Sequence, residues 1–320
     1  MGTPDFAGAS LKALVDAGKN VVAVVTTPDK PAGRGQKIQM STVKEYALSL
    51  NLPVLQPEKL KDEDFLAELR SFNAELFVVV AFRMLPEVVW SMPVMGTINL
   101  HASLLPQYRG AAPIQWAIMN GETVTGVTTF FIEKEIDTGK IISSKKVVID
   151  HNDTGGTLHD KLMNTGAALI TETVTDIENG TYNSVSQQGF TNDSEELKPA
   201  PKIFKEDCKI NWVLNSGRVL NFIRALSPYP VAWTYIQNAK GQKFMLRIFN
   251  AIHYNETTTA SALPLCHGRI FTDGKETLCI STADGWLKIT ELQLEGKKRM
   301  ATSDFIRGIA DISDWTICND

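Results

Sequence analysis

Residues 20–25, Asn-Val-Val-Ala-Val-Val, and residues 76–80, Leu-Phe-Val-Val-Val, are continuous apolar runs of strand length. Shorter runs of the same kind lie at 54–55 and 97–100, and stretches with helical periodicity alternate with them. Strands that are apolar on both faces must be covered on both sides, which is typical of parallel strands connected by helices. The sequence therefore predicts an α/β fold with a doubly wound, mostly parallel sheet. The expected helices cover residues 6–15, 43–50 and 65–69.

The pattern changes after residue 126. Two strands joined by a short turn are expected, one at 126–132 and one that combines 140–142 with 146–149. A long amphipathic helix is expected at 154–177 because its apolar residues recur with helical spacing. This helix completes the first predicted domain.

Residues 184–202 have the composition of a linker, since they are polar, acidic and rich in proline with little periodicity. We therefore expect a first domain at 1–183 and a second at 203–320. In the second domain a helix at 216–226 precedes short strands separated by turn residues, which is typical of a small OB-like barrel. The expected strands cover 231–236, 244–249, 268–271, 277–280 and 286–289.

The composition excludes several classes of protein. The 320 residues are 43% hydrophobic and 21% charged, and no apolar run approaches the ~18 residues of a membrane span. The first residues lack the basic and apolar regions of a secretory signal, so a cytoplasmic location is expected. The four cysteines have neither CxxC spacing nor histidines at zinc-ligand offsets, so we expect a reduced protein without a metal.

The net charge of −4 is unevenly distributed. Residues 1–200 contain 24 acidic and 17 basic side chains, whereas residues 201–320 contain 12 acidic and 15 basic side chains. A positive second domain suits a surface that meets a polyanion, although a domain without such a partner can carry the same charge.

Asn99 and His101 alternate with apolar residues at the end of a predicted strand. Period-2 geometry places both side chains on one face, near the carboxyl edge at which open α/β sheets bind ligands. An amide can stabilise a developing oxyanion, and an imidazole can transfer a proton at neutral pH. The alternative is a polar strand end whose hydrogen bonds are satisfied within the protein.

Asp137 lies in the turn Glu135-Ile-Asp-Thr-Gly139 between two apolar strands. An aspartate in a turn most often bonds to its own backbone. A carboxylate near His101 would instead orient the imidazole and keep it protonated, or accept a proton from an attacking amine. Asp137 is therefore a candidate third member of the site.

The loop at 27–37, Thr-Pro-Asp-Lys-Pro-Ala-Gly-Arg-Gly-Gln-Lys, follows a buried strand and carries three cations against one acid. Basic loops at a sheet edge often bind phosphate. The alternative is a solvated connection, because its GxG lacks the surroundings of a nucleotide-binding fingerprint.

Together these motifs resemble the methionyl-tRNA formyltransferases. The Asn99-x-His101 and Asp137-Thr-Gly139 motifs are shared with all folate-dependent formyltransferases. The stretch 109–114, Arg-Gly-Ala-Ala-Pro-Ile, and the loop 31–35, Pro-Ala-Gly-Arg-Gly, are particular to the enzymes that act on Met-tRNA and their near relatives. The resemblance extends over nearly the whole chain, with further matches at 2–6, 28–37, 78–81, 85–86, 99–113, 126–128, 156–161, 210–212 and 224–230.

The resemblance implies a Rossmann-like formyltransferase domain followed by an OB-like tRNA-binding domain, with initiator methionyl-tRNA as partner. The implied reaction moves the formyl group of 10-formyltetrahydrofolate to the α-amine of methionine on this tRNA. Asn99 and His101 would stabilise the oxyanion, while Asp137 would orient and charge His101 and take up the amine proton. The folate would be held by Val80, Ala81, Phe82, Arg83, Leu85, Pro86, Ser103, Leu104, Leu105, Pro106 and Ile136. The tRNA would be contacted by Lys30, Arg34, Lys37 and Arg109, and the protein is expected to be a monomer without metal or membrane.

The chain departs from the family pattern in two places. Most members have a loop of the type Ala-Tyr-Gly-Leu-Ile-Leu-Pro, whereas residues 81–86 read Ala-Phe-Arg-Met-Leu-Pro, one residue shorter and with a cation at Arg83. The family also begins with a hydrophobic strand directly before Gly-Thr-Pro-Asp-Phe, and here Met1 stands at the end of that strand. We therefore expect about six to ten apolar residues upstream of Met1 in the native protein, since a central strand is otherwise missing.

Four alternatives are open at this point. A formyltransferase could act on another amine, such as glycinamide ribonucleotide or an amino sugar, although the second domain and Arg34 argue against it. A formyl-folate hydrolase is the second alternative. A Rossmann-type oxidoreductase would need a dinucleotide fingerprint with a ribose-binding acid, which the sequence lacks. A tRNA-binding protein without catalysis would not need Asn99, His101 and Asp137 together.

Overall fold

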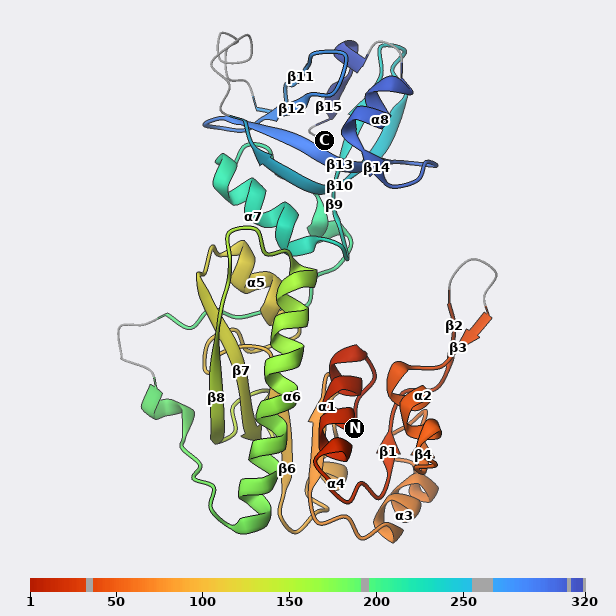
Figure 1. Ribbon diagram of the computed structural model, residues 1–320, viewed down its shortest axis with the longest axis vertical. Coiled ribbons are helices and arrows are strands. Elements are labelled where there is room, and N and C mark those ends of the chain that lie inside the picture. Colours follow the sequence, from red (N-terminus) through yellow and green to blue (C-terminus); the bar gives the residue numbers. More distant parts are fainter. Residues whose placement is uncertain (33–36, 191–195, 255–266, 310–311, 319–320) are drawn as a thin grey trace. The chain divides into compact units, whose positions relative to one another are not determined.

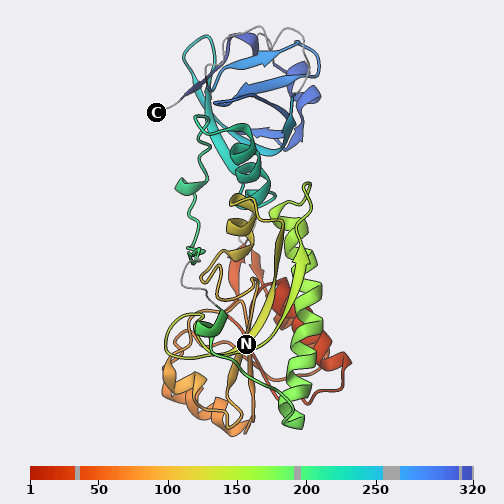
Figure 2. The ribbon, with the colours of Figure 1, turned by 90° about the vertical axis from the view of Figure 1, so that its left-hand side faces the viewer.

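The computed structural model describes residues 1–32, 37–190, 196–254, 267–309 and 312–318. The chain forms two compact units, both of which are visible in Figures 1 and 2. The first unit consists of Met1–Pro113, Val124–Val148 and Asp160–Ala200, and the second of Ile114–Thr123, Ile149–His159 and Pro201–Asp320. Two segments from within the range 1–183 thus group with the second unit, and the linear boundaries drawn from the sequence remain a prediction.

The first unit contains a four-stranded sheet in the order β5-β6-β7-β8. Strands β5 and β6 are parallel, and β7 runs antiparallel to both β6 and β8. A separate parallel pair is formed by β1 (Val24–Val25) and β4 (Val54–Leu55). The α/β fold predicted from the apolar runs is confirmed. The strands of the larger sheet are β5 (Phe77–Val80), β6 (Thr97–His101), β7 (Val124–Phe131) and β8 (Ile141–Val148).

One predicted strand is much shorter than expected, since the run at 20–25 contributes only Val24 and Val25, which pair with β4. The strand predicted by combining 140–142 with 146–149 is β8, and its ladder with β7 continues through Ser143 and Ser144. Serine is unremarkable in a half-exposed strand, so this continuity carries no hydrophobic signal.

The helices of the first unit begin where side chains satisfy their free backbone donors. The Ser41 hydroxyl accepts a hydrogen bond from Lys44 N at 3.2 Å, and the Asp62 carboxylate accepts one from Phe65 N at 3.1 Å. The apolar face of the first helix buries Phe6 in the core. The helices are α1 (Asp5–Asp16), α2 (Thr42–Ser49), α3 (Glu63–Ser71) and α4 (Glu87–Trp90), followed by α5 (Pro113–Met119) and α6 (Gly155–Asn179), which pass from one unit to the other.

Helix α6 covers β7 and β8. The hydroxyls of Thr129 on β7 and Thr173 on α6 are hydrogen bonded at 2.8 Å, and Lys145 on β8 pairs with Glu172 on α6 at 2.6 Å. The long amphipathic pattern at 154–177 therefore predicts this helix correctly.

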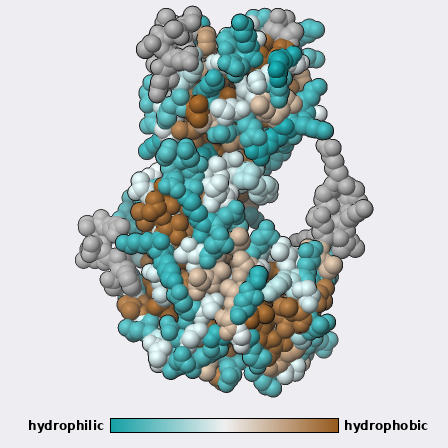
Figure 3. All heavy atoms as spheres, viewed as in Figure 1, coloured by the Kyte–Doolittle hydropathy of each residue, from teal (hydrophilic) through white to brown (hydrophobic). Residues whose placement is uncertain are grey.

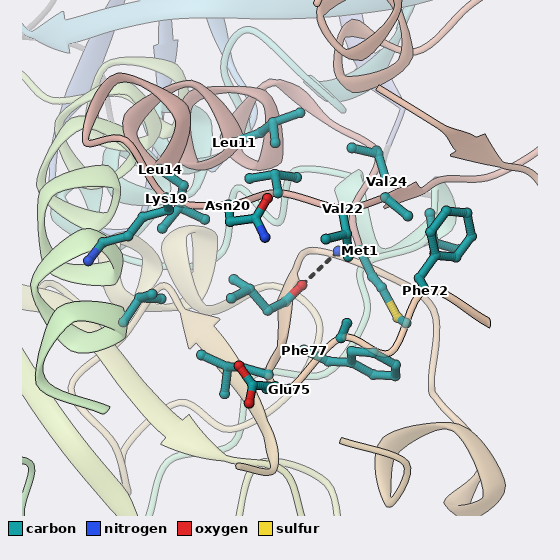
Figure 4. A pocket seen from close by; sticks show the side chains of 18 of the residues that line it. Met1, Leu11, Leu14, Lys19, Asn20, Val22, Val24, Phe72, Glu75 and Phe77 are labelled. Carbon is teal, nitrogen blue, oxygen red and sulfur yellow. Dashed lines mark hydrogen bonds between the residues drawn. The ribbon is translucent and has the colours of Figure 1, made fainter. Parts of the chain in front are cut away.

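A cavity of about 640 Å³ separates β1 from β5, which belong to different sheets. Met1 and Gly2 lie at one end of it, where Gly2 N donates to Val25 O at 3.0 Å and Val80 N donates to Met1 O at 2.9 Å. The Met1 amine donates to Val78 O at 2.6 Å, as Figure 4 shows. Met1 and Gly2 thus occupy two positions of a strand between β1 and β5, at the place where the sequence analysis expects a central strand.

The second unit is a curved antiparallel sheet preceded by α7 (Ser216–Leu226), whose first turn is capped by the Asn215 side chain. The strand order is β11-β12-β13-β10-β9-β15, and β14 pairs with β13. Trp212 and Ile223 are among the residues buried at its centre. The predicted barrel is therefore confirmed. Its elements are β9 (Ala232–Gln237), β10 (Lys243–His253), β11 (Ile270–Thr272), β12 (Leu278–Ser281), β13 (Trp286–Leu294), β14 (Met300–Ala301), α8 (Thr302–Arg307) and β15 (Thr316–Cys318).

Within the described part of the chain, no helix combines the length and the apolar character that a membrane crossing requires. Hydrophilic side chains cover much of the face seen in Figure 3, with hydrophobic residues in smaller groups between them. In the same described ranges, no cluster of three histidine, cysteine, aspartate or glutamate side chains is placed to hold a metal ion.

Candidate active site

Asn99 and His101 project from the same face of β6, which pairs with β5 on one side and β7 on the other. His101 is only 6% exposed, and its Nε2 lies 2.8 Å from the carbonyl oxygen of Tyr108. Because a carbonyl oxygen can only accept, Nε2 carries the proton of this hydrogen bond. The Asn99 amide has no hydrogen-bond partner among the described residues and is half-buried, so it can donate to a ligand.

The structure brings Asp137 to His101, as the sequence pattern predicts. Asp137 Oδ2 lies 3.8 Å from His101 Nδ1 and accepts a hydrogen bond from Gly110 N at 3.0 Å. Both side chains are largely buried, so the carboxylate faces the imidazole in a region of low water content.

The turn that carries Asp137 has an unusual backbone. Asp137 has φ of 55°, in the left-handed region that non-glycine residues seldom adopt. A Cβ atom at Gly139 would lie 1.7 Å from the carbonyl oxygen of Phe131, so only glycine fits there. Glycine at position 139 is thus required by the geometry of the turn that directs the Asp137 carboxylate toward His101.

Gln187 connects Arg109 to this turn, and sequence reasoning missed it. Its Oε1 accepts hydrogen bonds from Arg109 Nε at 3.1 Å and Nη2 at 2.6 Å. Its Nε2 donates to the carbonyl oxygens of Asp137 at 2.9 Å and Gly139 at 2.8 Å. Gln187 belongs to the short 3-10 helix η1 (Gln187–Phe190), inside the stretch predicted to be a linker. One glutamine in a polar stretch gives no signal that could have distinguished it.

The downstream end of the predicted linker is also part of the first unit. Ala200 N donates to Arg109 O at 2.8 Å, and Tyr108 N donates to Lys198 O at 2.8 Å. Gly110 has φ of 126°, and a Cβ atom there would lie 2.4 Å from the carbonyl oxygen of Ala200. This close approach of the Ala200 carbonyl requires glycine at position 110. The backbone N–H of the same residue is the one that donates to the Asp137 carboxylate.

Except for Ile136, which lies in the turn between β7 and β8, the residues predicted to hold folate lie on two segments at the same edge of the sheet, because β5 and β6 are parallel neighbours. Val80, Leu85 and Leu105 are buried, whereas Ile136 is 58% exposed. The Ser103 hydroxyl donates to Gln107 O at 2.6 Å, and Leu105 N donates to the hydroxyl of Thr128 at 3.2 Å. These two hydrogen bonds fix the backbone of the second segment. Contact with folate stays a prediction for all of the named residues: Val80, Ala81, Phe82, Arg83, Leu85, Pro86, Ser103, Leu104, Leu105, Pro106 and Ile136.

The cation at Arg83 has a structural partner. Its guanidinium donates to Glu58 O at 2.8 Å and to Pro57 O, and it lies over the ring of Phe82 at 5.5 Å from the centroid. Arg83 therefore ties the shortened loop to the segment that precedes α3.

The basic loop begins in a two-stranded hairpin, β2 (Lys30–Ala32) and β3 (Lys37–Gln39), which Figure 1 shows extending from the first unit. Its base is anchored by Asp29, which pairs with Lys44 at 2.6 Å and accepts a hydrogen bond from Gln56 at 2.8 Å. The hydrogen bond from Lys44 holds the pKa of Asp29 below its usual value. Arg34 lies outside the described residues.

An amide, an imidazole and a carboxylate at the carboxyl edge of an α/β sheet are the groups that an acyl-transfer enzyme needs. Comparison with known proteins narrows this class. The chain belongs to the formyl transferase family: the family's catalytic-domain model, described as formyl transferase, matches residues 1–174, and the model of its C-terminal domain matches residues 202–310.

The relatives with highly similar sequences are methionyl-tRNA formyltransferases. The protein of that name from Parabacteroides distasonis is 53% identical over 318 residues, covering 99% of this chain and 97% of the relative. The one from Bacteroides thetaiotaomicron is 54% identical over 308 residues, covering 96% and 94%. Nearly the whole chain is therefore shared, including both units.

Solved structures agree with the fold. An N-formyltransferase from Helicobacter canadensis, in complex with folinic acid and dTDP-3-aminofucose, has a TM-score of 0.62 at 23% identity over 93% of this chain and 97% of that chain. HypX from Aquifex aeolicus in complex with tetrahydrofolic acid has a TM-score of 0.57 at 21% identity over 81% and 43% of the two chains.

Proposed function

We propose that this formyltransferase moves the formyl group of 10-formyltetrahydrofolate to the α-amino group of methionine esterified to initiator tRNA. The observation that carries the proposal is the 3.8 Å approach of the Asp137 carboxylate to the His101 imidazole, with Asn99 two residues before His101 on the same face of β6. Identity of 53% over almost the full length to proteins named methionyl-tRNA formyltransferase supports this acceptor.

The reaction begins when the amine attacks the formyl carbon, so that a C–N bond forms and the formyl oxygen becomes an oxyanion. The Asn99 amide and the protonated His101 ring stabilise this charge. Asp137 keeps the imidazole charged and takes up the proton that the amine loses, through a water molecule. The bond between the formyl carbon and N10 of the folate then breaks, and N10 takes a proton.

The remaining sequence candidates are assigned to the two substrates. The segments at 80–86 and 103–106, with Ile136, hold the folate at the carboxyl edge of β5 and β6. Lys30, Arg34, Lys37 and Arg109 contact the tRNA, and the second unit provides further surface for it. Because initiator tRNA is aminoacylated and used in the cytoplasm, the protein acts there, and we expect it to act as a monomer.

The acceptor is tested directly with purified protein and 10-formyltetrahydrofolate. We expect kcat/KM for Met-tRNA to exceed that for glycinamide ribonucleotide or a nucleotide-linked amino sugar by at least about 10³-fold, because discrimination by polar contacts reaches this size. A folate at 100 times its Kd should stabilise the protein by about 2.7 kcal/mol, whereas NAD should not. Equal rates with a small amine would contradict the proposed acceptor.

The basic loop is tested with Arg34→Ala. We expect KM for Met-tRNA to rise and its salt dependence to become shallower by about one unit of slope or less, because one phosphate contact is lost. The affinity for folate should remain the same. Arg70→Ala, which removes an exposed cation from α3, is the matched control. A loss of folate affinity equal to the loss of tRNA affinity would place the loop at the folate instead.

A further inference from the structure

Gln187 is almost completely buried, at 3% exposure, and all of its hydrogen-bonding capacity is used. A primary amide offers two N–H donors and two acceptor positions. The two donors bind the carbonyl oxygens of Asp137 and Gly139, and the oxygen accepts both hydrogen bonds from Arg109. Such a fully satisfied buried amide fixes the groups around it in one arrangement.

The two backbone carbonyls that Gln187 binds belong to the strained residue Asp137 and to Gly139, two positions further on. A non-glycine residue at φ of 55° persists only where its surroundings hold it. The donation from Gln187 Nε2 holds the backbone of residues 137–139 directly after the strained torsion. On the other side, Gly110 N holds the carboxylate itself at 3.0 Å.

The amide can be oriented in only one way. Carbonyl oxygens accept and a guanidinium donates, so the nitrogen must face the turn and the oxygen must face Arg109. A carboxylate of the same shape at position 187 would keep the Arg109 contact but would place negative charge against two carbonyl oxygens. Glutamine is therefore required at this position by both of its neighbours.

We propose that Gln187 is the positioning residue for the Asp137 carboxylate. Arg109 fixes the orientation of the Gln187 amide by donating two hydrogen bonds to its oxygen. This inference deepens the proposed function and rests on it, since Asp137 serves the formyl-transfer site. Gln187 does not touch the reacting atoms. Its effect on the reaction passes through the backbone of residues 137–139 to the distance between the carboxylate and His101.

The test compares Gln187→Glu with Gln187→Met, which has a similar volume but neither amide donor. We expect both variants to lower kcat by about 10- to 100-fold, because a misplacement near 1 Å costs this much, while KM for the folate changes less than about threefold. Gln188→Glu adds the same charge at the exposed neighbouring position and should keep normal activity. The urea midpoint of each variant reports whether it is folded.

A double-variant cycle separates positioning from general structural support. If Gln187 acts through Asp137, adding Gln187→Met to Asp137→Asn should lower kcat by less than about twofold further. Additive losses in kcat would overturn the inference, and so would a normal rate in Gln187→Glu.

The rates are measured both with Met-tRNA and for slow transfer of the formyl group to water. A wild-type protein that hydrolyses the folate but does not formylate Met-tRNA would refute the proposed acceptor. The effect of the Gln187 variants would then be measured on the rate of hydrolysis. Additive losses in that rate, or a normal rate in Gln187→Glu, would still overturn the inference.

Discussion

Replacing His101 by asparagine is expected to lower kcat by at least about 10²-fold with little change in KM for either substrate. The imidazole is held by Tyr108 O on one nitrogen and faces Asp137 on the other. In the proposed mechanism this fixed ring supplies charge at the oxyanion without needing to reorganise. An asparagine at position 101 keeps a polar side chain but cannot carry that charge. His151→Asn, the same replacement at an exposed position, is the control.

The three site residues should act as a unit, because in the proposed mechanism each serves the same tetrahedral intermediate. We expect Asn99→Asp and Asp137→Asn to lower kcat by at least about 10²-fold each, and pairs of these changes to cost far less than the product of the single losses. Steady-state rates at saturating folate and Met-tRNA measure this. A His101→Asn variant with near-normal turnover would refute the mechanism.

The positions of Asn99, His101 and Asp137 were predictable because each leaves a mark in the sequence. Asn99 and His101 interrupt an apolar strand with the period of a β-strand, and the Asp-Thr-Gly turn follows the next strand. The ladder itself does not predict their approach, because β7 is antiparallel to β6 and Phe131 at its end pairs with Ile98 near the start of β6. The turn after β7 brings Asp137 back to His101, so local patterns marked the three residues and the resemblance to a known family supplied their roles.

Gln187 and Arg83 show where prediction from the sequence stops. Both bind backbone carbonyl oxygens of residues far away in the chain, and every residue type presents the same carbonyl. No pattern of side chains can therefore mark such partners. Arg109 is a further example. The resemblance assigned it to the tRNA, whereas in the structure its guanidinium donates to the side-chain amide of Gln187 within the first unit. Its predicted contact with tRNA stays a prediction.

The short strand β1 has a related cause. The apolar run at 20–25 has the composition of a strand along its whole length, yet only Val24 and Val25 pair. A strand needs a hydrogen-bonded neighbour, and residues 20–23 face the cavity between β1 and β5 where such a neighbour would have to lie. Composition predicts the tendency to form a strand, whereas pairing depends on what stands beside it.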